Sequence, residues 1–65
     1  MKILLDEYMY KKNLTERQVA RMTGVSKSTV HRILIGETIP RLDTLEQIAA
    51  GLHTRISFLY ESDYK

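Results

Sequence analysis

The most restrictive feature of the sequence is a connection of only three residues, TGV at positions 23–25, between two short predicted helices. The first helix begins after Thr15, because Thr15 and Gln18 form the capping-box pattern of a helix N-terminus. The second begins after Ser26, whose hydroxyl can accept a hydrogen bond from the free amide of Thr29. So short a connection requires the two helices to cross closely.

The residue types in this pair meet the demands of a close crossing. Ala20 places a small side chain in the middle of the first helix, and Gly24 can adopt the positive φ of a tight turn without steric strain. Val25, Val30 and Ile33 then dock the second helix on the first. A small residue, a glycine four positions later and a β-branched residue six positions after that are typical of a helix-turn-helix, here over about residues 16–35.

The rest of the chain also shows helical periodicity. Apolar residues recur at intervals of three and four, and runs of strict alternation are absent. Further helices are predicted over residues 2–12, 42–51 and 55–61, with Asn13 and Gly36 as helix stops. The sequence therefore predicts an all-α fold, a compact five-helix bundle in one domain over residues 1–65. The side chains expected to face the core are those of Leu4 or Leu5, Tyr8, Val19, Met22, Ile33, Leu34, Leu45, Ile48, Ala49, Ile56 and Leu59.

Length and composition exclude several classes of function. A chain of 65 residues builds one small core and leaves little room for a catalytic cleft, so we expect no enzyme. Without cysteine, and with only His31 and His53 as histidines, neither a metal site nor another cofactor is expected. The N-terminal apolar run covers three residues before Asp6, which is too short for a signal peptide or a membrane span. We expect a cytoplasmic protein with no membrane partner.

Positive charge is concentrated in the predicted helix pair. Residues 15–36 contain four basic residues and one acidic residue, a balance of +3, whereas residues 37–65 contain three basic and five acidic residues, a balance of −2. This distribution favours an anionic partner for the helix pair.

The segment LTERQVARMTGVSKSTVHRILIGETIPRLDTLEQIAAGL resembles the Cro/repressor (Xre-type) helix-turn-helix family, and the resemblance extends over residues 5–59. It implies a lambda-repressor-like DNA-binding domain that places its third helix in the major groove of a double-stranded DNA operator. It also implies association with the nucleoid. The residues that carry the resemblance are Leu14-Thr15, Val19-Ala20, Gly24-Val25-Ser26, Ser28-Thr29-Val30, Arg32-Ile33, Gly36, Pro40, Leu45, Ile48-Ala49, Leu52 and Leu59.

The polar face of the second helix of the pair supplies the predicted base readers. In the family, the positions of Lys27, Ser28 and Arg32 commonly reach base edges, and Thr29 and His31 lie beside them. At 100° per residue, Lys27 and His31 are one turn apart, opposite the apolar stripe. The alternative is a charged face that is only hydrated, as on most exposed helices.

Contacts to the DNA backbone are predicted on both sides of the reading helix. Arg17 lies in the first turn of the preceding helix, where the family meets the backbone, and Arg41 follows Pro40 in the next loop. Ser26 and Ile35 flank the reading helix itself. Ordinary solvation of loop and surface charges is the alternative for both arginines.

The chain departs from the family at three points. Glu16 replaces a glutamine that usually touches a phosphate, and a carboxylate there repels phosphate unless it pairs with Lys27 or Arg17. Met9 and Leu34 stand where relatives often have an arginine–glutamate pair, so an apolar contact is expected in its place. His53 replaces the glycine or asparagine that often ends the fourth helix, which predicts a less regular cap.

We expect a sequence-specific transcriptional regulator, and a repressor more than an activator. Phe58 and Tyr60 are predicted to face outward from the fifth helix, as a homodimer interface or as side chains partly buried on neighbouring elements. A dimer that forms on DNA would span half-sites about 34 Å apart. A protein effector is a further expected partner. Two alternatives stay open: an antitoxin-like protein and an adaptor, in both of which the main partner is another protein.

Overall fold

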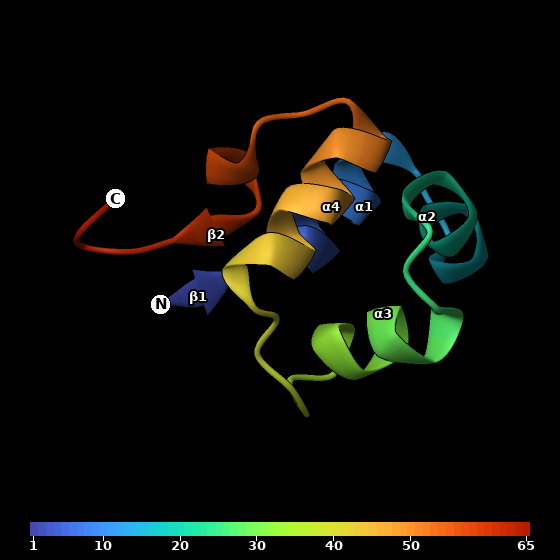
Figure 1. Cartoon of the computed structure of the whole chain (residues 1–65), viewed down its shortest axis with the longest axis horizontal. Coiled ribbons are helices and arrows are strands. Elements are labelled where there is room, and N and C mark those ends of the chain that lie inside the picture. The colour runs from blue at the N-terminus through green and yellow to red at the C-terminus, as the bar shows by residue number, and fades with distance from the viewer.

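Four α-helices form the body of the molecule, and a two-stranded sheet joins the two ends of the chain (Figure 1). The computed structural model describes all residues, 1–65. None of its helices combines the length and the apolar character needed to cross a membrane. In chain order the elements are β1 (Lys2–Ile3), α1 (Leu5–Lys12), α2 (Glu16–Thr23), α3 (Lys27–Leu34), α4 (Leu42–Leu52), the 3-10 turn η1 (Ile56–Phe58) and β2 (Tyr60–Glu61).

The prediction of a fifth α-helix over residues 55–61 is wrong. The segment forms η1 followed by β2, which pairs antiparallel with β1 so that Ile3 lies opposite Tyr60. The backbone amide of Leu4 donates to the carbonyl of Leu59 (N···O 2.8 Å), and α1 accordingly begins at Leu5 and not at Lys2. The backbone of β2 and of Leu59 bonds to the start of the chain, and this pairing satisfies the backbone groups that a helix would otherwise pair internally.

The core is confirmed in most of its predicted members. The buried apolar side chains are Leu5, Met9, Val19, Val25, Val30, Ile33, Leu45, Ile48, Ala49, Leu52 and Leu59. The prediction for Met22 is wrong, because its side chain is exposed and the neighbouring Thr23 is buried. Burial of Thr23 is tolerated because its hydroxyl donates to the carbonyl of Val19 (2.7 Å) and accepts from the amide of Val25 (3.2 Å).

The helix ends follow the sequence closely. Thr15 and Gln18 form both bonds of the predicted capping box, and Asn13 and Gly24 are in the left-handed conformation, with φ of 58° and 77°. The expected irregularity at His53 is absent. His53 is also left-handed (φ 57°), and two backbone bonds, His53 to Ala50 and Thr54 to Ala49, close the end of α4.

The helix α2 packs against both α3 and α4. Gly51 makes the crossing with α4 very close: a Cβ atom at this position would lie 2.5 Å from the carbonyl oxygen of Met22 and from the Cα of Thr23. Gln47 fixes the same crossing, since its side-chain amide donates to the carbonyl of Thr23 (3.0 Å). The sequence predicts a close approach only at Ala20, between α2 and α3, and the approach of Gly51 to α2 was missed.

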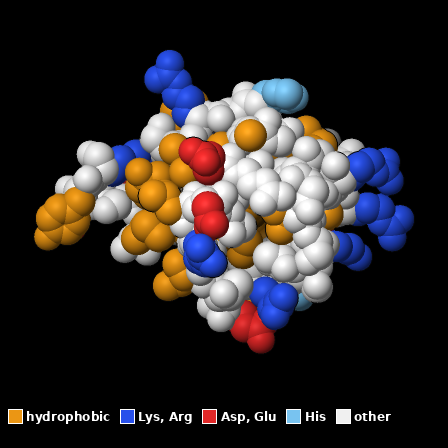
Figure 2. All heavy atoms as spheres, in the orientation of Figure 1, with side chains coloured by type: hydrophobic (Ala, Val, Ile, Leu, Met, Phe, Trp, Pro, Cys, Tyr) orange, Lys and Arg blue, Asp and Glu red, His pale blue; other side chains and the backbone are white.

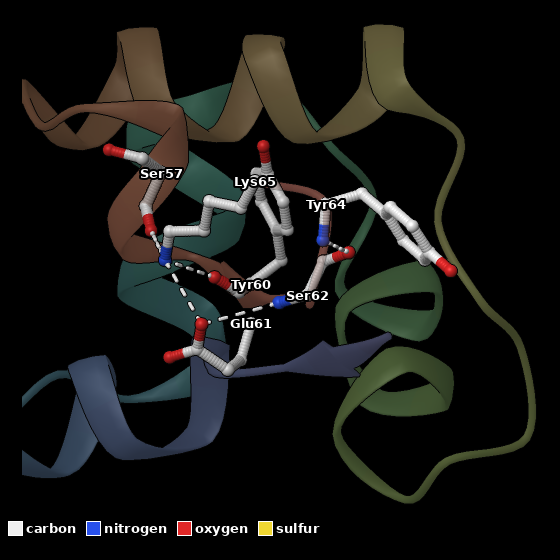
Figure 3. Close-up of polar contacts among 6 residues, drawn as sticks. All are labelled: Ser57, Tyr60, Glu61, Ser62, Tyr64 and Lys65. Atoms are coloured by element: carbon white, nitrogen blue, oxygen red, sulfur yellow. Dashed lines mark hydrogen bonds and ion pairs between the residues drawn. The ribbon is translucent and has the colours of Figure 1, made fainter.

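The C-terminal segment is held by Lys65, as Figure 3 shows. Its ammonium group donates to the carbonyl oxygens of Ser57 (2.6 Å) and Tyr60 (2.8 Å) and lies 3.7 Å from the carboxylate of Glu61. It also lies over the ring of Tyr60, 5.3 Å from the centroid. These contacts keep the segment beside η1 and β2.

Candidate nucleic-acid interface

The helix α3 presents one apolar side to the core and one polar side to solvent. Val30 and Ile33 are buried and dock the helix. The side chains of Lys27, Ser28, His31 and Arg32 are exposed. The structure therefore brings these four predicted base readers together on one free surface, as the helical spacing requires.

Ser26 and Thr29 are engaged at the start of α3. The Ser26 hydroxyl accepts from the amide of Thr29 (3.2 Å), which confirms the predicted cap, and donates to the Thr29 hydroxyl (2.8 Å). It also lies 3.4 Å from the hydroxyl of Ser28. Thr29 is half-buried. The hydroxyls of Ser26 and Thr29 thus serve the helix start, while Ser28 faces solvent with its hydroxyl at the edge of this group.

Glu16 pairs with neither of the partners suggested by the sequence. Its carboxylate lies 3.1 Å from Nδ1 of His31, and the two side chains are 32 % and 54 % exposed. Glu16, Lys27, Ser28 and His31 together line a shallow depression between the start of α2 and α3. The pair depends on how the two helices cross, and the periodicity of either helix alone gives no signal for it.

The residues predicted to contact the DNA backbone flank α3 in the sequence: Arg17 precedes it, and Ile35 and Arg41 follow it. Arg17 is exposed in the first turn of α2, and Ile35 is exposed where α3 ends. Arg41 immediately precedes α4, and its guanidinium lies 3.4 Å from the carboxylate of Asp43. Both of these side chains are highly exposed, so the pair is weak and leaves the guanidinium available to another anion.

Side-chain types are unevenly distributed over the face drawn in Figure 2. Lys and Arg side chains gather at the end of the molecule where α2 lies, and apolar side chains gather toward β2 and the C-terminus. The basic residues of the helix pair, Arg17, Arg21, Lys27 and Arg32, are all exposed.

Of the two aromatic residues proposed for an interface, only Phe58 is exposed (59 %). Tyr60 lies in β2 and not in a helix, and its side chain is half-buried and packs against the core. At the second departure from the family, Met9 is buried and Leu34 packs against the core, so both positions are apolar contributors to the interior.

A protein-family model described as helix-turn-helix matches residues 5–59. Comparison with curated proteins and with solved structures found no match. The matched range extends from the start of α1 to Leu59, so it contains α2, α3 and every residue predicted to contact a base or the DNA backbone.

Proposed function

The chain belongs to the helix-turn-helix family of the Cro/C1 (Xre-like) type, and from this premise we propose that it is a sequence-specific DNA-binding repressor. In this proposal α3 lies in the major groove of an operator, and its exposed side reads base edges. Occupation of the operator then blocks access of RNA polymerase to an overlapping promoter.

The observation that carries the proposal is the composition of the free side of α3. Lys27 and Arg32 have only donors, which suit O6 and N7 of guanine, and the Ser28 hydroxyl can donate or accept. His31 completes the row of readers, and the half-buried Thr29 offers its methyl group to a thymine methyl. Since Val30 and Ile33 fix the other side of the helix, these readers are held on a rigid element.

Phosphate contacts orient the reading helix but carry no sequence information. We assign them to Arg17 before α3 and to Arg41 after it, with Ser26 and Ile35 beside the backbone at the two ends of α3. Both arginines are exposed, and neither is held by a strong ion pair.

A homodimer supplies the remaining affinity in this proposal. One copy measures 31 × 24 × 21 Å, so two copies side by side can place their α3 helices about one DNA turn, roughly 34 Å, apart. We assign exposed Phe58 to the dimer contact, with Tyr60 supporting it from β2, and the contact forms on DNA.

The test is selection from random duplex DNA, followed by affinity measurements over a range of salt concentrations. We expect Lys27→Ala/Arg32→Ala to lose about 5- to 150-fold in discrimination per base contact, equivalent to about 1–3 kcal/mol. Arg17→Ala should weaken binding to all sequences alike and reduce the salt slope by about one. Arg55→Ala is the matched control, because it removes an exposed arginine that lies outside α2 and α3.

Two results would refute the proposal. If Lys27→Ala/Arg32→Ala selects the same sequence as the wild type, the exposed side of α3 does not read the bases. A wild-type chain that binds no duplex at low salt, but co-purifies with a second protein covering Phe58, favours an antitoxin-like or adaptor function instead.

A further inference from the structure

The pair formed by Glu16 and His31 is the only side-chain hydrogen bond or ion pair between α2 and α3. It joins the first residue of α2 to the middle of the reading helix, with Nδ1 and Oε2 3.1 Å apart. Because both residues line the depression beside Lys27 and Ser28, the pair lies within the proposed reading surface.

The chemistry of the pair determines which ring nitrogen of His31 carries the proton. An ionised carboxylate can only accept a hydrogen bond, so the Nδ1 atom must donate. A neutral imidazole has a single N–H, and with that proton on Nδ1 the other nitrogen, Nε2, keeps a free lone pair. No group of the protein donates to Nε2, and the His31 side chain is 54 % exposed.

A hydrogen-bond acceptor at Nε2 of His31 differs from the neighbouring side chains on the exposed side of α3. Lys27, one turn before His31, and Arg32, the next residue, offer only donors and therefore suit guanine. In the major groove, donors are presented only by the exocyclic amino groups, N6 of adenine and N4 of cytosine. An unprotonated Nε2 can accept a hydrogen bond from either of these amino groups. Opposite guanine or thymine it would meet another acceptor, and no hydrogen bond could form.

We propose that Glu16 fixes His31 as an acceptor and that His31 thereby selects a base with an exocyclic amino group, adenine or cytosine, in the major groove. The inference rests on the proposed DNA-binding function and names one element of its specificity. His31 contacts the base, and Glu16 is a positioning residue that acts through the imidazole. This role also explains why a carboxylate stands at the start of α2. Without the carboxylate, a helix N-terminus at this position would attract a phosphate.

Two variants separate the parts of the pair. Glu16→Ala removes the acceptor for Nδ1, and His31→Asn keeps an amide N–H near the position of Nδ1 but has no atom in place of Nε2. Glu46→Ala is the matched control, since it removes an exposed carboxylate on α4 that pairs with no base reader. Thermal unfolding of each variant verifies that the fold is retained.

The first measurement is the two-bond proton–nitrogen NMR spectrum of the histidine rings in the free protein, with the imidazoles neutral. We expect the Nδ1–H form for His31 in the wild type and in Glu46→Ala, and a shift toward the Nε2–H form in Glu16→Ala. A wild-type ring in the Nε2–H form would overturn the inference without any use of DNA.

The second measurement is selection from random duplex DNA. The wild type should prefer adenine or cytosine at one position, and His31→Asn should lose about 2- to 12-fold of that preference, the range for one hydrogen bond. Glu16→Ala should reduce the same preference, while the guanine preferences of Lys27 and Arg32 persist.

The outcomes distinguish this inference from the function on which it rests. If the wild type selects no sequence at all, the proposed function fails and the inference fails with it. If the wild type is selective but Glu16→Ala keeps every preference, or if the position lost in His31→Asn is guanine or thymine, only the inference fails.

Discussion

Substitution of Gly51 by alanine tests the closest helix crossing in the molecule. Glycine inside a helix is ordinarily a weakness, and its replacement by alanine stabilises an exposed helix by about 1 kcal/mol. At Gly51 the added Cβ meets the Met22 carbonyl oxygen and the Thr23 Cα at 2.5 Å, and the Thr23 Cγ2 at 2.9 Å. Two of these atoms belong to the backbone of α2, so the methyl group can be accepted only if α2 moves away from α4.

The expected loss of unfolding free energy is the cost of overpacking at Gly51 minus the gain in helix propensity from glycine to alanine. Overpacking costs about 1–3 kcal/mol, and a clash with the backbone of a neighbouring helix belongs at the upper end of that range. With about 1 kcal/mol returned by helix propensity, Gly51→Ala should lose roughly 2 kcal/mol of unfolding free energy. For a domain of this size, that loss lowers Tm by about 8–16 °C.

The assay is thermal and urea unfolding followed by circular dichroism. Ala50→Gly provides the matched control, because Ala50 is the exposed neighbour on α4 and its change should cost about 1 kcal/mol through propensity alone. A higher Tm for Gly51→Ala would refute the close contact between Gly51 and α2. The change would then be equal and opposite to that of Ala50→Gly and would reflect helix propensity alone.

Three further substitutions test other contacts. His53→Gly should raise Tm, since it relieves about 1 kcal/mol of left-handed strain; an unchanged Tm would contradict the φ of 57° at the end of α4. Met9→Arg should lower Tm strongly because it buries an unpaired charge beside the core, and a Tm equal to that of the wild type would show that this side chain is not enclosed. In the proposed complex with DNA, Glu16→Gln removes a negative charge near the phosphates and should strengthen binding to all duplexes at low salt; titrations at high salt should show no gain, and an equal gain at both salt concentrations would contradict an electrostatic origin.

Local chemistry allowed most helix ends and the core to be predicted. The capping box of Thr15 and Gln18, the cap at Ser26 and the left-handed residues Asn13 and Gly24 depend only on neighbours within a few positions. The same holds for the free side of α3, because helical spacing alone separates Val30 and Ile33 from the polar residues.

Features that depend on distant segments could not be predicted. Residues 55–61 have helical spacing, but the backbone of Leu59 and of β2 bonds to the start of the chain, and single-sequence periodicity contains no information on that pairing. The assignment of Met22 to the core failed by one position, because a two-turn helix leaves its last apolar residue poorly defined. The Glu16–His31 pair and the approach at Gly51 both require the crossing geometry of two helices.

The pairing of β1 with β2 has a consequence for the order in which the molecule folds. Lys2 and Glu61 are separated by 59 positions (61 minus 2), and closing a loop of that length costs roughly 3–4 kcal/mol of chain entropy. Two residue pairs, the bond from Leu4 to Leu59 and the burial of Leu59 offset this cost, whereas α2 and α3 meet across a three-residue turn. The sheet should therefore form last and open first. In hydrogen exchange, amides at both chain ends should exchange through local opening while those of α2 and α3 stay protected, so α3 stays folded during fluctuations that release the termini.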